Sequence, residues 1–218
     1  MSGRIDSLNV VHAEIPDVGG SVGVTAIDKR PVTDRRGVTP AGVAGDHRSD
    51  MKDHGSEDQA VYAYASEDYA WWCRQLGREL PAGVFGENLT TSGIDVTHAV
   101  IGATWRMGTA LLQVSAPRIP CGTFQRWMAE ERWVKRFTDA GRPGTYLRVL
   151  EAGELARGDA IEIVSVPGHG VTVLDCFRVY TGDRDAERLR RVAACEMVDA
   201  GTREKARRPG QAARPGPV

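Results

Sequence analysis

The stretch AVIGATWRMGTALLQVSAPRIPC, residues 99–121, contains the pattern that decides the fold. Apolar and polar residues alternate on either side of Gly108, which predicts two strands joined by a short turn. The second strand runs directly into Pro-Arg-Ile-Pro-Cys, after which apolar residues recur at helical spacing from Thr123 to Phe137. We therefore expect Cys121 at a strand-to-helix junction, at or just before the N-terminus of the helix.

Similar alternation predicts further strands along the chain. They are a hairpin over residues 7–32 that turns at Gly19 and Gly20, and single strands at 59–65, 145–150 and 160–166. Residues 33–58 are polar and lack periodicity, so we expect a long loop there. Ser66 is the expected N-cap of a helix that continues through Leu76.

The character of the sequence changes near Pro167. Beyond it, three short helices are predicted at 171–180, 186–194 and 198–208. We therefore expect a mostly β protein of the α+β class. The predicted parts are a barrel-like β body with peripheral helices over residues 1–167, a helical appendage over 168–208 and a disordered tail over 209–218.

The composition excludes several classes of function. The chain has 218 residues, 26% charged residues and a formal net charge of −1, which gives no general electrostatic reason to bind a nucleic acid polymer or an anionic membrane. It contains neither an apolar run of roughly 18 residues, as a transmembrane helix needs, nor an apolar signal-peptide stretch near Met1. The four cysteines are never spaced as Cys-x-x-Cys. We therefore expect no structural zinc site, no disulfides and a cytoplasmic location.

Cys121 is the candidate nucleophile or metal ligand, because only a thiolate performs either role. The expected helix N-terminus and the nearby cation of Arg118 would both stabilise a thiolate, and the two prolines of the segment would fix the direction of the sulfur. One thiolate held in this way suits a soft or high-valent metal better than zinc, which takes several protein ligands. The alternative is a small buried core residue. The residues alone leave both interpretations open for Cys121, whereas Cys73, Cys176 and Cys195 fit the core interpretation.

The other polar candidates have simple structural alternatives. The Asp46-His47 pair and His54 could be metal ligands, but no further partner stands at metal-site spacing, and loop histidines are usually solvated. The Glu87-Asn88 pair could form an exposed turn. Arg148 would need an anionic partner if it faced inward and no partner if it faced outward.

Several segments, in their order and intervals, resemble the MOSC domain family, named for the C-terminal part of molybdenum cofactor sulfurases. They are residues 83–90 (GVFGENLT), 101–102 (IG), 105–108 (WRMG), 117–121 (PRIPC) and 141–149 (GRPGTYLRV). The resemblance extends over about residues 40–166 and is greatest to the stand-alone bacterial YiiM-like subgroup. Members of that subgroup carry a three-helix appendage similar to the one predicted here.

The resemblance implies a β-barrel with a pocket for the molybdenum cofactor, a molybdopterin with its metal. Cys121 would ligate the molybdenum or carry sulfur as a persulfide. The residues expected to line the pocket are His54, Phe85, Gly86, Glu87, Asn88 and Leu89. Arg118 and Arg148 are the cations expected at the cofactor's phosphate, and Glu87 and Asn88 are expected to hydrogen-bond its heterocycle. Ser56 and Gln59 stand where the family has a glycine and frequently a basic residue, and this departure concerns the His54 end of the site.

Three functions agree with these residues. The favoured one is an oxidoreductase that reduces N-hydroxylated compounds, such as hydroxylaminopurines, by two electrons at a molybdenum held by Cys121. The alternatives are a sulfur carrier or transferase that uses a Cys121 persulfide, and a cofactor-binding module without catalysis. The chain has no flavin or iron–sulfur motif and no pyridoxal-phosphate desulfurase domain. The oxidoreductase would therefore need a separate electron-donating reductase, and the sulfur carrier would need a partner that loads it.

Overall fold

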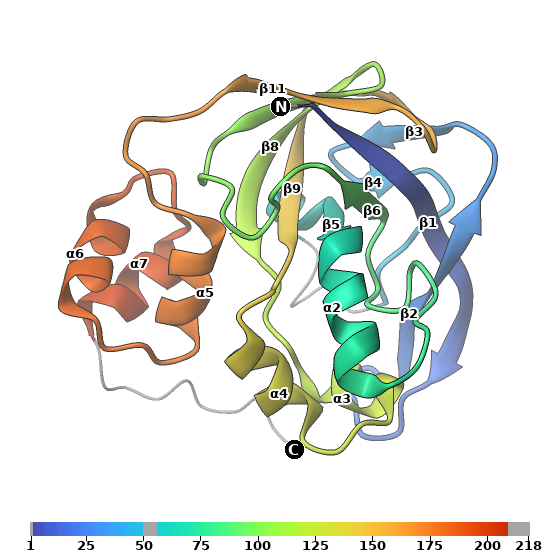
Figure 1. Cartoon of the computed structure of the whole chain (residues 1–218), viewed down its shortest axis with the longest axis horizontal. Coiled ribbons are helices and arrows are strands. Elements are labelled where there is room, and N and C mark those ends of the chain that lie inside the picture. Colours follow the sequence, from blue (N-terminus) through green and yellow to red (C-terminus); the bar gives the residue numbers. More distant parts are fainter. Residues whose placement is uncertain (1, 50–55, 209–218) are drawn as a thin grey trace.

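The chain forms a closed β-barrel with helices packed around it, described over residues 2–49 and 56–208 in a computed structural model (Figure 1). The strands are β1 (Ser2–Pro16), β2 (Val24–Val32), β3 (Arg36–Thr39), β4 (Gly42–Val43), β5 (Val61–Ala65), β6 (Leu89–Ser92), β7 (Thr104–Met107), β8 (Ala110–Pro117), β9 (Thr145–Glu151), β10 (Gly153–Leu155) and β11 (Ala160–Ser165). The helices are α2 (Ser66–Leu76), α3 (Gly122–Met128), α4 (Trp133–Ala140), α5 (Val173–Tyr180), α6 (Ala186–Ala194) and α7 (Ala200–Arg207), with a 3₁₀ turn η1 (Glu57–Gln59).

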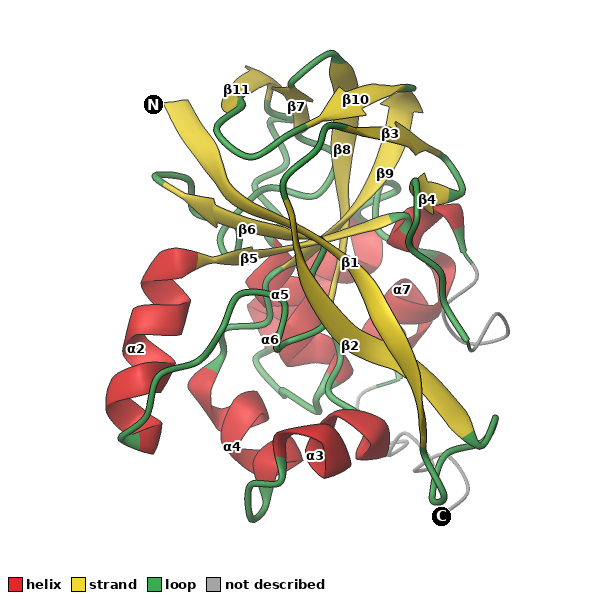
Figure 2. Cartoon of the chain, turned by 90° about the vertical axis from the view of Figure 1, so that its right-hand side faces the viewer, coloured by secondary structure: helices red, strands yellow, loops and turns green. Residues whose placement is uncertain are grey.

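The barrel is closed by pairing between its first and last strands. The order around it is β11, β7, β8, β9, β5, β6 and β1, and antiparallel pairing of β1 with β11 completes the circle. Among the described strands, β5 and β6 alone are parallel neighbours. β2 pairs with β1 and continues the wall as a long twisted hairpin whose far end lies at the level of α3 (Figure 2). The mostly β, barrel-like fold expected from the sequence is confirmed.

β5 shows how one short strand joins two packed regions. Its sequence Val-Tyr-Ala-Tyr-Ala is buried at every position. Because side chains alternate across a strand, Val61 and Ala63 pack with the apolar core of the barrel, whereas Tyr62 and Tyr64 pack with an aromatic cluster. That cluster lies against α2, α3 and α4 and includes Trp72, Phe85, Phe124, Trp133 and Phe137.

The structure corrects the predicted helix over residues 123–137. Two helices, α3 and α4, occupy this stretch, and they are separated at Ala129 and Arg132, whose φ angles are 52° and 54°. Phe124 on α3 and Phe137 on α4 are both buried in the aromatic cluster. Because both helices turn their apolar faces to one cluster, the apolar residues keep helical spacing across the break. The spacing alone therefore does not indicate that the helix is interrupted.

Two smaller expectations are also wrong. The predicted loop over residues 33–58 contains β3 and β4, which form a small sheet with β10 because β3 pairs with that distant strand. Ser66 does not cap α2. It is the first residue of that helix, and its hydroxyl donates instead to Asp6 at 2.8 Å.

The predicted C-terminal helices are present as α5, α6 and α7, gathered on one side of the barrel (Figure 1). Thr172 and Asp175 form a capping box at α5, and Asp185 caps α6. Most buried apolar side chains of these helices belong to the same hydrophobic cluster as the barrel interior, whereas Phe177 of α5 packs in the aromatic cluster. A domain division after residue 167 stays a prediction, and the predicted tail over 209–218 lies outside the described residues. Among the described helices, none is long and apolar enough to span a bilayer.

Candidate functional site

Cys121 lies at the predicted junction between strand and helix. β8 ends at Pro117, and Cys121 is the N-cap residue of α3 with extended backbone angles, φ −129° and ψ 174°. Its side chain is half-buried, whereas Cys176 and Cys195 are buried. Burial raises the pKa of the Cys176 thiol, as expected of a core cysteine.

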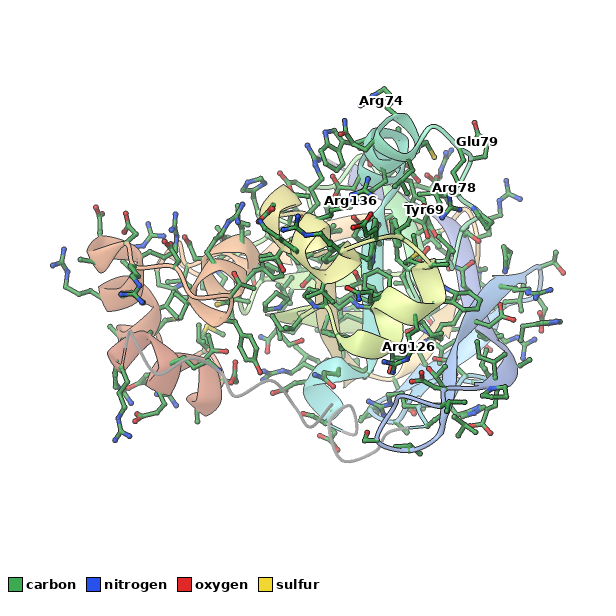
Figure 3. The ribbon with its side chains drawn as sticks, turned by 90° about the horizontal axis from the view of Figure 1, so that it is seen from below. Tyr69, Arg74, Arg78, Glu79, Arg126 and Arg136 are labelled. Carbon is green, nitrogen blue, oxygen red and sulfur yellow. The ribbon has the colours of Figure 1, made fainter. Side chains whose placement is uncertain are left out.

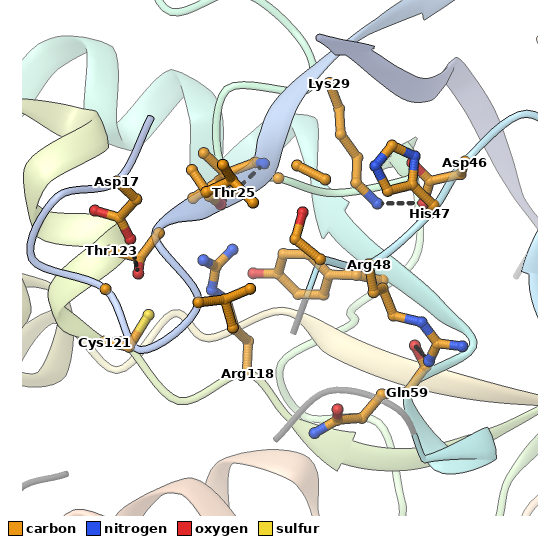
Figure 4. A pocket seen from close by; sticks show the side chains of 18 of the residues that line it. Asp17, Thr25, Lys29, Asp46, His47, Arg48, Gln59, Arg118, Cys121 and Thr123 are labelled. Carbon is orange, nitrogen blue, oxygen red and sulfur yellow. Dashed lines mark hydrogen bonds and ion pairs between the residues drawn. The ribbon is translucent and has the colours of Figure 1, made fainter. Parts of the chain in front are cut away.

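A pocket opens beside Cys121. Its empty volume is about 940 Å³, the open solvent at its mouth included. Figure 4 shows Cys121, Asp17 and Thr123 at one end of the pocket and Lys29, Asp46 and His47 at the other. The arrangement therefore separates a thiol end from a charged end.

Arg118 lines this pocket from a buried position. Its guanidinium stacks over the Phe124 ring at 3.9 Å and lies 5.3 Å from the Tyr62 ring centroid. One of its nitrogens donates to the carbonyl oxygen of Phe85. Gly86 lies against this cation and has a φ of 75°, which favours glycine. A Cβ built there would lie 3.2 Å from Ile27 Cγ1 and 3.4 Å from the guanidinium.

The charged end is built around the ion pair of Lys29 and Asp46. Their side chains are 9% and 7% exposed, and Nζ lies 2.5 Å from the carboxylate. Burial lowers the pKa of Lys29 and outweighs the raising effect of Asp46. Asp46 also accepts from the amide of Asn88 at 2.8 Å. Arg48 borders the same end and donates to backbone carbonyls, including that of Ser56 at 3.0 Å.

The thiol end contains a second buried carboxylate, Asp17. It accepts from the Thr123 hydroxyl at 2.6 Å and from the Arg126 guanidinium at 2.5 Å. The hydrogen bond from Arg126 lowers the pKa of Asp17. Figure 3 looks at this end of the molecule and labels Arg126 on α3. These contacts connect the tip of the β1–β2 hairpin to the helix that begins directly after Cys121.

The structure brings only part of the predicted 85–89 loop to the pocket. Gly86 and Asn88 line it, whereas Phe85 is buried in the aromatic cluster and Leu89 in the barrel core. Glu87 is fully buried and does not line the pocket, so its expected contact with a cofactor stays a prediction. The chain turns here, because the Gly86 N–H donates to the Gly83 carbonyl at 2.8 Å and the φ of Gly86 is 75°, and this turn sets which residues face the pocket.

Glu87 instead closes its own loop. A single carboxylate oxygen accepts from the Tyr69 hydroxyl, the Gly83 N–H and the Thr90 hydroxyl, each at 2.7 Å. Its burial raises the pKa of the carboxyl. Asn88 lines the pocket, but its side-chain oxygen already accepts from the Tyr62 N–H at 3.1 Å.

Arg148, another predicted site residue, does not line the pocket. It pairs with Asp58 at 3.0 Å, so this neighbouring carboxylate, rather than a ligand, neutralises its charge. His54 lies outside the described residues. His47 reaches Glu14 at 2.9 Å and does not join Asp46 in a ligand set. Within residues 2–49 and 56–208, no three His, Cys, Asp or Glu side chains converge as they would to hold a metal ion.

Few local patterns in the sequence indicate the other residues in and beside the pocket. Lys29 carries the clearest signal, because it continues the alternation of Thr25 and Ile27 along β2, where a charged residue faces the interior. Asp17 and Arg126 lie 109 positions apart and have no such local signal.

Comparisons with known proteins agree with the barrel, and the matched region includes the 83–90 segment, of which Gly86 and Asn88 line the pocket. Residues 50–162 match the family model of the MOSC domain. The chain is 34% identical over 173 residues to the uncharacterized protein YflK of Bacillus subtilis (strain 168), covering 79% of this chain and 78% of YflK. It is 33% identical over 142 residues to a protein of Gibberella moniliformis named reductase, covering 63% of this chain but only 25% of the fungal protein. The crystal structure of YiiM from Geobacillus stearothermophilus superposes with a TM-score of 0.76 at 29% identity, covering 95% of this chain and 98% of YiiM.

Proposed function

Because this chain belongs to the MOSC domain family, we propose that it binds the molybdenum cofactor at the pocket beside Cys121 and reduces N-hydroxylated compounds there. The observation that carries the proposal is the pairing, in one pocket, of an accessible thiol with buried cations at some distance from it. The cofactor needs the same two things: a soft ligand for its metal and a positive environment for its phosphate.

The residues of the pocket fit this group. Cys121 would supply the thiolate ligand, and one protein ligand suffices because the pterin brings sulfur ligands of its own. Arg118, Lys29 and Arg48 would hold the phosphate and the pterin. The buried amide oxygen of Gln59 also lines the pocket and has no hydrogen-bond partner among the described residues. A donor N–H of the pterin would satisfy it.

The proposed reaction converts R–NHOH, two electrons and two protons to R–NH₂ and water. When bound, the molybdenum centre supplies the two-electron chemistry. The chain's own residues would hold the cofactor, present Cys121 to it and partly exclude water. The electrons would come from a separate reductase. A fungal relative is named reductase, and this chain matches 25% of its length.

The test compares two cysteine variants of the full chain, made in a host that synthesises the cofactor. We expect molybdenum and pterin in the wild type and in Cys73→Ser, and neither in Cys121→Ser. Cys73 is the matched control because it is half-buried like Cys121 but does not line the pocket. Molybdenum is measured by mass spectrometry and pterin by fluorescence after oxidation. Loaded protein should then reduce a hydroxylaminopurine with a reduced viologen dye as the electron donor.

Three results would contradict the proposal in distinct ways. If Cys121→Ser retained the cofactor, the Cys121 thiol would not be a required ligand of the metal. A loaded protein that reduces no N-hydroxylated compound would favour a cofactor-binding module. A wild type that carries no molybdenum but accepts labelled sulfur on Cys121 would favour the sulfur carrier.

A further inference from the structure

We propose that the β1–β2 hairpin tip, through Val22 and Val24, forms a wall that selects N-hydroxylated substrates with an uncharged, apolar body. The inference deepens the proposed function and rests on it. Both valines line the pocket, and both also remain open to water, with exposed fractions of 47% and 40%. Half-exposed valines at the mouth of a pocket leave apolar surface for a ligand to cover.

The neighbouring lining residues extend this apolar surface. Ala26 and Ile27 on β2 and Ile119 beside Cys121 also line the pocket. By contrast, the charged groups Lys29, Asp46, His47 and Arg48 lie at the other end (Figure 4). A ligand that places its N–OH group near Cys121 would therefore rest its remaining atoms against valine and isoleucine side chains.

The hairpin tip is held in place relative to Cys121. Asp17, at the start of the tip, binds Thr123 and Arg126 of α3 at 2.6 and 2.5 Å. A Cβ built on Gly19 or Gly122 would lie 3.0 Å from the Arg126 guanidinium, so both glycines make room for this cation. The cation thus lies between the tip and the residue that follows Cys121. A wall fixed to the reacting end can discriminate between substrates, whereas a loose loop could adapt to any of them.

The chain offers a matched control for this wall. Val18 belongs to the same tip but does not line the pocket, and it is 97% exposed. Threonine has nearly the shape of valine and adds a hydroxyl. A double variant with Val22→Thr and Val24→Thr therefore removes apolar contact while it keeps the volume, and Val18→Thr makes the same chemical change away from the pocket.

The kinetic experiment uses two substrates that share the reacting N–OH group. With cofactor-loaded protein, we expect the double variant to raise KM for phenylhydroxylamine roughly threefold to tenfold with little change in kcat. KM for hydroxylamine, which has no apolar body, should stay within about twofold. Val18→Thr should change neither. If the double variant leaves KM for phenylhydroxylamine unchanged, the wall does not contact the substrate and the inference fails.

A second measurement does not depend on turnover. In cofactor-free protein, N-phenylmaleimide and N-methylmaleimide modify Cys121 at rates that peptide mass spectrometry distinguishes from those of Cys73. We expect the ratio of phenyl to methyl rates at Cys121 to fall roughly threefold in the double variant and not in Val18→Thr. If loaded wild type reduces neither substrate, the proposed function is refuted, and this ratio still decides whether the wall recognises an apolar body.

Discussion

Replacing Glu87 with alanine should lower the free energy of unfolding by about 3–4 kcal/mol without removing a ligand from the pocket. Glu87 stands in the family-like loop next to Asn88, yet the structure makes it a support of that loop. One of its oxygens accepts three hydrogen bonds of 2.7 Å, from Tyr69, Gly83 and Thr90. The variant therefore tests whether this carboxylate maintains the fold or contacts a cofactor.

The magnitude follows from the donors that alanine leaves behind. Each buried donor without a partner costs about 1–3 kcal/mol, and the loss is partly offset because a buried carboxylate no longer has to be desolvated. For a chain of this size, a net loss of 3–4 kcal/mol corresponds to a fall in Tm of roughly 10 °C. Glu87→Gln keeps an oxygen for the three donors and should cost only about 1 kcal/mol.

The stability difference between the wild type and Glu87→Gln should also depend on pH. Burial raises the pKa of Glu87 above its ordinary 4.5, so the folded protein binds this proton more tightly than the unfolded chain. The resulting stabilisation is complete below pH 4.5 and is lost as the pH rises through the folded-state pKa. The stability of the wild type relative to Glu87→Gln should therefore increase as the pH falls from 8 toward about 5.

Urea unfolding, followed by tryptophan fluorescence at a series of pH values, measures these differences. Molybdenum content at saturating cofactor supply provides the functional readout. The reasoning would be refuted if Glu87→Ala lost less than about 1 kcal/mol. If Glu87→Gln were stable but failed to retain the cofactor, this result would instead support a direct contact between Glu87 and the cofactor.

Two further predictions concern the ends of the pocket. Arg118→Met should reduce bound molybdenum and pterin several-fold, because it removes a buried cation that faces the pocket. Arg148→Met, which disrupts only the half-exposed pair with Asp58, should leave cofactor content unchanged, and equal losses in both variants would contradict this assignment. Asp17→Asn should lower unfolding free energy by about 1–2 kcal/mol at pH 7. Since Arg126 holds the Asp17 pKa below 3.8, this difference should be complete above pH 3.8 and shrink as the pH falls through the depressed pKa. Urea titrations at pH 7 and at a series of acidic pH values measure it, and a difference that does not change with pH would contradict the reasoning.

The sequence by itself determined most of the longer elements and the position of the thiol. Alternation on either side of Gly108 located β7 and β8, and the helical spacing after Thr123 located the helix start that places Cys121 at its N-cap. These features are local, since period and turn chemistry act over a few residues. The same locality explains the main error in the helices. The spacing over 123–137 could not show that two helices turn toward one cluster.

Only the tertiary structure decided which side chains meet around that thiol. Within the 85–89 loop it turned Gly86 and Asn88 to the pocket and Glu87 away from it. The barrel closure and the long hairpin brought Asp17 to Arg126 across 109 positions of sequence. Such pairings depend on how strands pair and twist and on how helices pack against them, which no window of neighbouring residues contains. The sequence therefore placed Cys121 at a helix start with Arg118 nearby, while Lys29, Val22 and Val24 joined the pocket only through the fold.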